Sequence, residues 1–334
     1  MDVGSDSAVP VSLIVTVRDD RPGFAELLDA IAEQVEMPDE IVVVDGGSTD
    51  GTLDELTVRT AKLPPVRVFH APGSNIGAGR NVAVREARHD WIVCTDAGCR
   101  PVPGWLSAFK RASAVADIAA GTWVVDAETA LDRAVACAHY PVLEEVHDDD
   151  PVVRLAHRLF GRDFRAEQAG GRSMAFSREA WEAAGGFREH VYAGEDLAFS
   201  AAAVELGFRP ALVEEATVRW RPRSTWAANA RMFFIYTRGD IRTKGKARHV
   251  ARLAAWTAGP LVFLKGGPAG KALVTAGAAA YLWLPMRRAR RSLPPSEWWR
   301  VPALVVLKDL AQLAGAGTGL VDAARGVSQP RPHR

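Results

Sequence analysis

Short apolar, β-branched runs alternate in the N-terminal part of the chain with segments whose apolar residues recur at helical spacing. Runs of the first kind, bounded by proline or polar residues, predict buried strands at Val11–Val17, Ile41–Val44, Val66–Phe69 and Trp91–Thr95. The apolar residues between Pro22 and Pro38 predict a helix, with Phe24, Leu27, Leu28, Ile31 and Val35 on one side. A further helix is predicted over Gly79–Ala87. This alternation indicates an α/β sheet whose strands are mostly parallel.

The middle of the chain has a less regular pattern. Strands are predicted at Gly121–Asp126, Arg172–Phe176, Phe208–Val213 and Thr217–Trp220. Glycine commonly ends a helix, so helices are predicted at Arg178–Ala184, before Gly185-Gly186, and at Glu195–Leu206, before Gly207. The acidic stretch Glu144–Asp150 predicts a solvated loop.

The last third changes in character. The segment Arg219–Arg252 is rich in Lys and Arg and contains a single acid, Asp240, and two apolar stretches follow it, Leu253–Leu264 and Ala272–Met286. Both stretches are shorter than the roughly 20 residues that a membrane-spanning helix needs. Directly after them come Arg287, Arg288, Arg290 and Arg291. The pattern predicts an interfacial or re-entrant helical pair beside anionic lipid, with a buried helical hairpin as the alternative.

Composition narrows the class of protein further. With 334 residues and 48% hydrophobic content, the chain can form one large domain or one domain with an appendage. Lys and Arg total 41 against 40 Asp and Glu, so no global positive field selects a nucleic acid. The segment Met1–Pro10 lacks the basic start of a secretory signal. Cys94, Cys99 and Cys137 show no pairing pattern and predict reduced thiols in the cytosol.

Polar motifs stand where the predicted strands end, and open α/β sheets bind ligands at that edge. Transfer of a sugar from a nucleotide diphosphate needs groups that hold the nucleotide, cations for the departing diphosphate and a base for the acceptor hydroxyl. Asp45-Gly46-Gly47 follows the second strand: the glycines allow close approach, and Asp45 can accept hydrogen bonds from a base or ribose. A tight turn whose side chains cap the next helix explains the same residues.

Other motifs supply charged groups. Gly77-Ala-Gly79-Arg80 opens a helix and suits a phosphate, although an ordinary glycine-rich loop has the same composition. Asp96 follows the fourth strand, where its carboxylate can face a metal-bound diphosphate or cap a turn. Glu195-Asp196 opens a later helix; Asp196 is the candidate proton acceptor, although the helix dipole alone favours acids there.

In order and spacing these motifs resemble those of the family 2 glycosyltransferases, which have a GT-A fold. The first strand with Arg18-Asp19 resembles that family's opening strand and first nucleotide contact. Val43-Val-Asp45-Gly-Gly-Ser-Thr-Asp50-Gly-Thr resembles its second nucleotide motif, and Asn75-Ile-Gly-Ala-Gly79-Arg80-Asn81 its Gly/Arg segment. Asp96-Ala-Gly98 occupies the place of its Asp-x-Asp metal motif.

The likeness continues on the acceptor side and covers about residues 10–225. Gly170-Gly-Arg-Ser-Met-Ala-Phe176 and Gly185-Gly-Phe187 resemble the family's acceptor-side strand and turn. Glu195-Asp196 matches its Glu-Asp pair, whose Asp is taken as the catalytic base in inverting members. The resemblance therefore implies a GT-A catalytic domain over residues 1–225 with a mostly parallel central sheet. A helical, basic and apolar C-terminal region over 226–334 is expected to contact a membrane.

The resemblance also implies a set of roles. Asp196 deprotonates the acceptor hydroxyl, and Glu195 orients Asp196 or touches the sugar. The donor, UDP- or GDP-linked, is held by residues that contact its nucleotide or diphosphate: Arg18, Asp19, Asp45, Gly46, Arg80, Asp96, Arg221 and Arg223. Mg²⁺ or Mn²⁺ binds Asp96. The acceptor is a glycan or a lipid-linked molecule, and the expected location is the cytoplasmic face of a membrane.

Two departures from the family pattern bear on the metal. Gly98 replaces the second carboxylate of the metal motif, and no His lies between Thr217 and Thr225, where some members supply a ligand. Arg80, Arg221 and Arg223 can offset part of the diphosphate charge, but a cation clamp and a metal are different devices.

Two other functions compete with the transferase. A sugar-nucleotide-binding, non-catalytic partner of a membrane complex is compatible with the loss of the carboxylate at Gly98. A sugar-phosphate nucleotidyltransferase needs a glycine-rich, basic loop directly after the first strand, where this chain has Thr16-Val-Arg-Asp-Asp-Arg-Pro-Gly.

Overall fold

The computed structural model describes residues 9–160, 163–191, 193–240 and 246–325 and divides into two compact units. The sheet unit comprises Met1–Val124 and Phe164–Trp220, and the helical unit comprises Val125–Asp163 and Arg221–Arg334. The sequence predicted one boundary at residue 225. In the structure the boundary falls after Trp220, and the segment 125–163, predicted as part of the catalytic domain, joins the helical unit.

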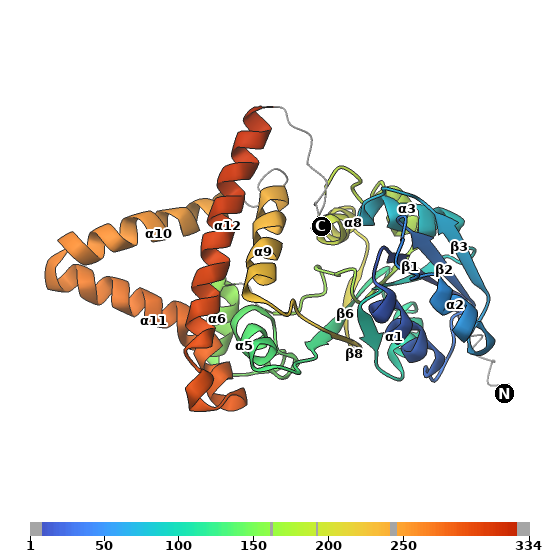
Figure 1. Cartoon of the computed structure of the whole chain (residues 1–334), viewed down its shortest axis with the longest axis horizontal. Coiled ribbons are helices and arrows are strands. Elements are labelled where there is room, and N and C mark those ends of the chain that lie inside the picture. The colour runs from blue at the N-terminus through green and yellow to red at the C-terminus, as the bar shows by residue number, and fades with distance from the viewer. Residues whose placement is uncertain (1–8, 161–162, 192, 241–245, 326–334) are drawn as a thin grey trace. The chain divides into compact units, whose positions relative to one another are not determined.

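The sheet unit contains an eight-stranded sheet with the order β3-β2-β1-β4-β7-β6-β8-β5 (Figure 1). The strands are β1 (Val11–Val17), β2 (Glu40–Asp45), β3 (Val66–His70), β4 (Trp91–Asp96), β5 (Cys99–Pro101), β6 (Ile118–Val125), β7 (Met174–Ser177) and β8 (Pro210–Trp220). The strands β1 to β4 are parallel, whereas β7 runs antiparallel to β4 and β6, and β5 antiparallel to β8. The mostly parallel α/β sheet predicted from the sequence is confirmed.

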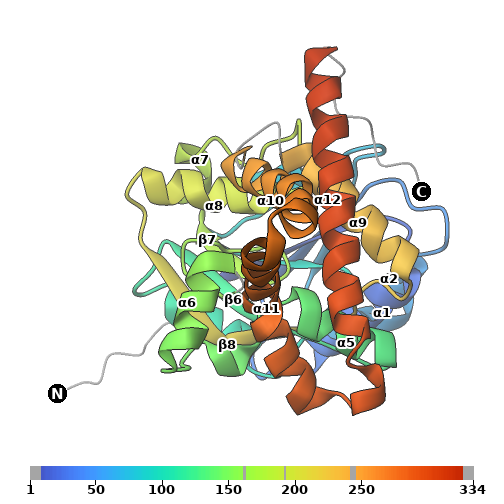
Figure 2. The ribbon, with the colours of Figure 1, turned by 90° about the vertical axis from the view of Figure 1, so that its left-hand side faces the viewer.

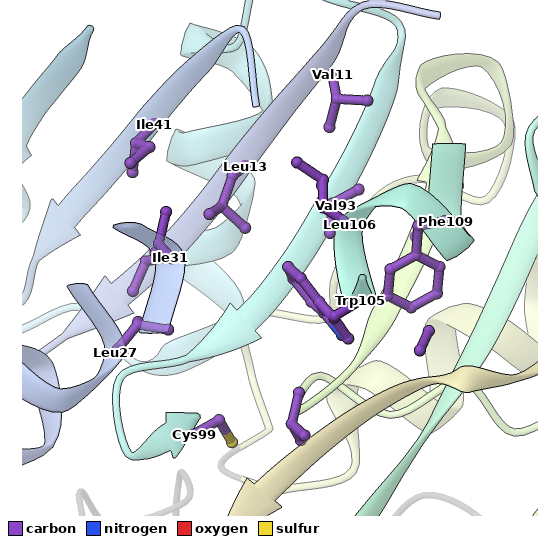
Figure 3. Packing of buried hydrophobic residues seen from close by; sticks show 14 of the residues in the cluster. Val11, Leu13, Leu27, Ile31, Ile41, Val93, Cys99, Trp105, Leu106 and Phe109 are labelled. Carbon is purple, nitrogen blue, oxygen red and sulfur yellow. The ribbon is translucent and has the colours of Figure 1, made fainter. Parts of the chain in front are cut away.

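Helices cover both faces of the sheet because successive side chains of a buried strand point to opposite sides. On one face, α1 (Arg21–Ala32) and α4 (Trp105–Ala112) pack against odd-numbered residues of β1, β2 and β4. Figure 3 shows Leu27 and Ile31 of α1, with Trp105 and Phe109 of α4, close to the strands that carry Leu13 and Val93. The Trp105 and Phe109 rings meet edge to face, with centroids 5.4 Å apart.

On the opposite face, even-numbered strand residues such as Ile14 and Ile92 pack against α3, α7 and α8. These helices span Ile76–Glu86, Arg178–Ala183 and Glu195–Glu205, and α2 (Asp54–Arg59) follows β2. Phe176 of β7 meets Phe199 of α8 with centroids 5.0 Å apart, which ties α8 to the sheet. The start of α8 is therefore fixed relative to the ends of the strands.

Several local predictions differ from the structure. The first helix ends at Ala32, one turn before Val35, whose side chain is 75% exposed. Thr217–Trp220 and most of Phe208–Val213 lie in one strand, β8, which begins at Pro210. The acids Glu214 and Glu215 interrupt the apolar pattern but not the strand, because β8 needs only one buried face.

The helical unit contains six α-helices in the described residues. They are α5 (Ala130–His139), α6 (Pro151–Phe160), α9 (Trp226–Asp240), α10 (Lys246–Lys265), α11 (Gly267–Ser292) and α12 (Arg300–Ala324). The helix α12 packs against α9 and also contacts α5 (Figures 1 and 2). The two apolar stretches predicted as a helical pair lie in α10 and α11. The helix α12 was not predicted, although Val301, Leu304, Val305 and Lys308 recur at helical spacing and are buried.

The helices α10 and α11 form a hairpin around Gly266, and its turn points away from α12 (Figure 1). Large apolar side chains near this turn are exposed, among them Leu261, Phe263, Leu264 and Leu273. Among the described residues one helix, Pro295–Ala324, is long and apolar enough to cross a membrane, and 39% of its apolar window is buried within the protein. Core helices of other proteins pass the same length test, so α12 alone does not define a membrane span.

The prediction of a solvated loop over Glu144–Asp150 is wrong at Glu145, which is buried. Its carboxylate accepts a hydrogen bond of 3.0 Å from Arg288 Nε, and His157 Nε2 lies 3.2 Å from the same group. Asp148 accepts two hydrogen bonds of 2.9 Å from Arg287. Both arginines therefore bind acids of the same unit, whereas the sequence predicted a helical pair beside anionic lipid, with a buried hairpin as the alternative.

The pair Glu145–Arg288 yields a stability prediction. Burial alone would raise the pKa of Glu145, but hydrogen bonds from His157 and Arg288 outweigh it and lower the pKa from 4.5 to about 2. The stabilisation is therefore present above pH 4.5 and lost as pH falls toward 2. Glu145→Gln should lower the free energy of unfolding by about 3 kcal/mol at pH 7. At acid pH the variant and the wild type should differ less in this free energy, because the wild type has also lost the stabilisation. Denaturant titrations across this pH range measure both effects.

Glu144→Gln is the matched control, since Glu144 is the exposed neighbour of Glu145. Equal effects of the two substitutions at pH 7 would contradict the assignment of the stabilisation to the buried pair.

Candidate active site

Three loops meet at the carboxyl edge of the parallel strands. The central strand β1 lies between β2 and β4, and its Thr16 is paired with Val44 on one side and Asp96 on the other. Asp45 follows Val44, so Asp45 and Asp96 end the two strands that flank β1. Since neighbouring strands lie about 4.8 Å apart, both acids belong to the same edge of the sheet, as the sequence predicted.

Asp45 organises the turn after β2. Its carboxylate accepts hydrogen bonds from the backbone N–H groups of Gly47 (3.2 Å) and Ser48 (3.0 Å), and only 3% of the residue is exposed. Burial would raise the pKa of Asp45, but the bonds from Ser48, Gly47 and His70 outweigh this effect and lower it. The tight-turn role weighed from the sequence is therefore present in the structure, and Asp45 is an ionised acceptor at neutral pH.

The loop after β1 is joined to this turn. Asp19 has a positive φ of 48° and accepts a hydrogen bond of 2.8 Å from Thr49 N, while its own N–H donates to Ser48 Oγ. A Cβ atom added to Gly46 would lie 3.3 Å from Arg18 Cβ, so Gly46 allows the two loops to approach closely. The predicted nucleotide residues Arg18, Asp19, Asp45 and Gly46 are therefore brought together.

A buried guanidinium joins the other predicted acids. Arg80 of α3 is 1% exposed, and it donates to Asp96 Oδ1 (2.7 Å) and to Glu195 Oε1 (2.6 Å). These partners end β4 and begin α8, so one side chain connects three elements. The sequence predicted that Arg80 would contact a phosphate. In the structure its two terminal nitrogens hold carboxylates instead.

Asp196 lies next to this network. Its Oδ2 accepts a hydrogen bond of 2.8 Å from Gly171 N, in the segment that precedes β7. The side chain is half-buried, and its negative charge acts on Arg80. Asp96, Glu195 and Asp196 therefore converge on a single buried cation, whereas Asp45 belongs to the neighbouring turn.

The charges in this cluster do not balance. Burial alone would lower the pKa of Arg80, but the surrounding negative groups hold it well above its ordinary value. Burial raises the pKa of the Cys94 thiol to about 12, so this neighbour is neutral at pH 7. Burial, reinforced by Asp196 and opposed by Arg80, raises the pKa of Glu195 to about 7. One positive charge thus faces up to three carboxylates, and the excess negative charge favours an additional cation or a proton.

The segment before α8 is anchored to α3 by two asparagines. Asn81 accepts hydrogen bonds from Phe187 N (2.8 Å) and Trp181 Nε1 (3.1 Å) and donates to the Phe187 carbonyl. Asn75 caps α3 by accepting from Ala78 N and donates to the Val191 carbonyl. The Asn75–Asn81 motif therefore positions the chain that leads to the Glu195–Asp196 pair.

The structure fits a cation held partly by a substrate. No group of three or more His, Cys, Asp or Glu side chains suitable for a metal occurs in the described parts of the chain. Asp96 is the acid at the metal-motif position, and a Cβ atom on Gly98 would lie 3.5 Å from Asp20 Oδ2, an acid of the β1 loop. Mg²⁺ is commonly bound by one or two carboxylates together with substrate phosphates, and these residues match that arrangement.

Arg221 and Arg223 belong to the helical unit. Arg221 Nη2 lies 3.1 Å from Glu128 Oε1 of the same unit. The cluster around Arg80 is formed without these two arginines.

Gly171 is a site residue whose role the sequence did not predict. Its N–H binds Asp196, and a Cβ atom there would overlap the Arg80 guanidinium. From the sequence, the resemblance to the family placed Gly170 and Gly171 in an acceptor-side strand and gave them no further role. Two consecutive glycines in front of a buried strand were the signal that the sequence offered. The glycine is needed because Gly171 contacts Arg80, which lies 91 positions earlier in the sequence.

Family models agree with this geometry. Residues 12–133 match the model of glycosyl transferase family 2, and residues 76–315 match that of glycosyl transferase family 21. Because the second model covers more than half of the chain, the protein is a glycosyltransferase that belongs to glycosyl transferase family 21. The family 2 domain predicted from the motifs is confirmed over residues 12–133.

Solved structures share the fold. The mannosyltransferase PcManGT from Pyrobaculum calidifontis, in complex with GDP-Man and Mn²⁺, has a TM-score of 0.60 and 22% identity; the match covers 92% of this chain and 88% of that one. S. aureus TarS 1–349 in complex with UDP-GlcNAc has a TM-score of 0.50 and 16% identity, with 95% and 92% covered. These likenesses confirm the GT-A fold. Among curated proteins no match was found.

Gly171→Ala tests the network around Arg80. The new methyl group must displace the guanidinium and leave carboxylates without their partner, so the free energy of unfolding should fall by about 3 kcal/mol or more. Neither Gly170 nor Gly171 has a positive φ, so alanine fits the backbone at both positions. Urea titrations at pH 7 measure the effect.

Gly170→Ala is the control. A Cβ atom there meets only Asp196 Oδ2, at 3.7 Å, so the change should stay within about 0.5 kcal/mol. Equal stability of the two variants would refute the close packing of Gly171 against Arg80.

Proposed function

We propose that the protein is an inverting glycosyltransferase that moves a sugar from a nucleotide-diphosphate donor to an acceptor hydroxyl. The observation that carries this proposal is the convergence of Asp96, Glu195 and Asp196 on Arg80 at the carboxyl edge of the sheet. Ligands of open α/β sheets bind at that edge. The membership of a glycosyltransferase family favours the transferase over the nucleotidyltransferase and the non-catalytic partner.

Asp196 is proposed as the general base. It accepts the proton of the acceptor hydroxyl while the oxygen attacks the anomeric carbon, and the bond from that carbon to the donor diphosphate breaks on the opposite side. Of the two adjacent acids, Asp196 is the more exposed, and its Oδ2 is oriented by Gly171 N. Glu195 is buried and bound to Arg80, so it positions the start of α8 and the guanidinium.

The donor is proposed to lie over the loops after β1, β2 and β4. Arg18, Asp19, Asp45 and Gly46 border the nucleotide, and Asp96 faces the diphosphate. Mg²⁺ or Mn²⁺, when bound by Asp96 and the diphosphate, would stabilise the negative charge of the leaving group. The excess of carboxylates over Arg80 favours such a cation. GDP-Man in PcManGT and UDP-GlcNAc in TarS support a UDP- or GDP-linked donor.

The acceptor is proposed to be a glycan or a lipid-linked molecule, with the protein at the cytoplasmic face of a membrane as a peripheral component of glycan biosynthesis. Support comes from the hairpin of α10 and α11. Leu264 and Leu273 beside its turn are 75% and 69% exposed, and Lys265 and Lys271 stand next to them. Apolar side chains flanked by lysines suit the interface of an anionic bilayer.

Asp196→Asn tests the general base. Asparagine keeps an oxygen that can accept from Gly171 N but has no carboxylate to take a proton. We expect kcat to fall by at least about 100-fold while donor affinity stays within about threefold. Transfer assays measure the first quantity. A thermal-shift panel of UDP- and GDP-sugars, with and without Mn²⁺, identifies the donor and measures the second, because a ligand of the folded state raises its stability.

Asp117→Asn is a suitable control, since Asp117 pairs with Arg209 away from this cluster. Wild-type turnover in Asp196→Asn would remove Asp196 as the base. Donor binding by wild type with neither transfer nor donor hydrolysis would favour the non-catalytic alternative.

Leu264→Glu tests the membrane contact. The new charge at the hairpin turn should lower binding to phosphatidylglycerol-containing vesicles by about tenfold or more, because burying an unpaired carboxylate in lipid is costly. Vesicle flotation measures the bound fraction. The control is Val58→Glu, at an equally exposed (75%) position on α2 of the sheet unit. Vesicle binding that is absent in wild type, or unaffected by Leu264→Glu, would refute the contact.

A further inference from the structure

An arginine lies against two tryptophan rings in the sheet unit. The guanidinium carbon of Arg172 is 4.2 Å from the ring centroid of Trp220 and 5.1 Å from that of Trp123. The two indoles meet edge to face, with centroids 6.1 Å apart and ring planes inclined at 74°, and Trp123 also meets the ring of Phe164 edge to face at 5.5 Å. Arg172 and both indoles are only partly buried. The reaction proposed above uses none of these side chains.

The backbone around Arg172 is tied to the catalytic carboxylates. The Arg172 carbonyl accepts a hydrogen bond of 2.7 Å from Thr95 Oγ1, and Thr95 precedes Asp96. The N–H of the preceding residue, Gly171, donates to Asp196. Arg172 is thus attached on one side to the segment of Asp96 and on the other to Asp196.

Strand pairing brings Trp220 to the same place. Residue Cys99 of β5 is directly opposite Trp220 of β8 in the antiparallel register, and Cys99 follows Asp96 by only three positions. Burial and Asp96 raise the pKa of the Cys99 thiol to about 12, and the positive charge of Arg172 opposes them. Both charges therefore act on the same sulfur. The Arg172–Trp220 stack lies beside the turn that carries Asp96.

Stacking on indole faces restricts what a guanidinium can bind. Aromatic faces attract a guanidinium, and contact with two inclined indole rings limits the orientations that Arg172 can take. The planar fork of an arginine matches two oxygens of a phosphate. Gly98 stands where the metal motif has its second carboxylate. A positive side chain close to Asp96 could therefore offset part of the negative charge of a diphosphate.

We propose that Arg172, held against Trp123 and Trp220, binds a phosphate group of a substrate next to Asp96. The proposal rests on the glycosyltransferase function only for the origin of the phosphate. One source is the diphosphate of the nucleotide donor, and the other is the phosphate of a lipid-linked acceptor.

Calorimetric titrations of the full chain test the site with four probes. Inorganic pyrophosphate reports the phosphate site without a nucleoside, UDP and GDP report the donor, and a short-chain prenyl phosphate reports the acceptor. Uridine and guanosine, which carry no phosphate, are the negative controls. The variants are Arg172→Gln and Arg172→Lys, with Arg209→Gln as a matched control on a surface arginine that pairs with Asp117.

Arg172→Gln should weaken pyrophosphate binding by about 10- to 100-fold, since charge-assisted hydrogen bonds are lost, and leave nucleoside binding unchanged. Arg172→Lys keeps the charge but not the fork, so it should be at least several-fold weaker than wild type; it also serves as the test if the Gln variant does not fold. Arg209→Gln should bind as wild type does.

The outcomes separate the sources. If the Arg172 variants lose affinity for pyrophosphate and for UDP or GDP but not for prenyl phosphate, Arg172 binds the donor diphosphate. If they lose affinity for prenyl phosphate, Arg172 binds the phosphate of the acceptor. Unchanged affinity of the Arg172 variants for every phosphate probe, or no phosphate binding by wild type, overturns the proposal. Binding that depends on Arg172 in a protein without transfer activity would reject the proposed function and leave the phosphate site intact.

Discussion

A positive charge buried among carboxylates is the interaction on which the sheet unit's site depends. Arg80 is almost fully removed from water, and its charge is tolerable only while Asp96 and Glu195 are in place. These partners come from the end of β4 and the start of α8, so the folding free energy and the position of the acids are set by the same contacts. The acids are consequently oriented before any substrate binds, which is the condition for electrostatic catalysis.

The parallel strands β1, β2 and β4 were predictable because they are buried on both faces. Such strands appear as continuous apolar runs, and Val11–Val17 was predicted with its observed ends. The antiparallel strands of the sheet were harder to predict. Only one face of β8 is buried along much of its length, so its acids suggested two strands where there is one. The helix α12 follows an arginine-rich segment and was not predicted, although its buried residues recur at helical spacing.

The site was predictable in its acids but not in its connections. Asp45, Asp96 and Asp196 stand at strand or helix ends, where sequence position itself indicates a ligand-binding edge. That Arg80 is a buried partner of acids, that Gly171 makes room for it, and that Arg172 stacks on two indoles are tertiary contacts between distant segments. Composition at each position gives no sign of them. The same holds for Glu145, whose acidic neighbours suggest solvent while Arg288 buries it.

The interleaved order of the two units has a consequence for synthesis on the ribosome. The chain completes β6, leaves the sheet to form α5 and α6, and returns at Phe164 to build β7 and α8. Both early helices emerge before α11 and α12, their packing partners, have been translated. Their apolar faces therefore lack these partners while the rest of the sheet unit is synthesised, a period in which nascent chains are prone to misassembly. No single cut in the polypeptide could release either unit whole.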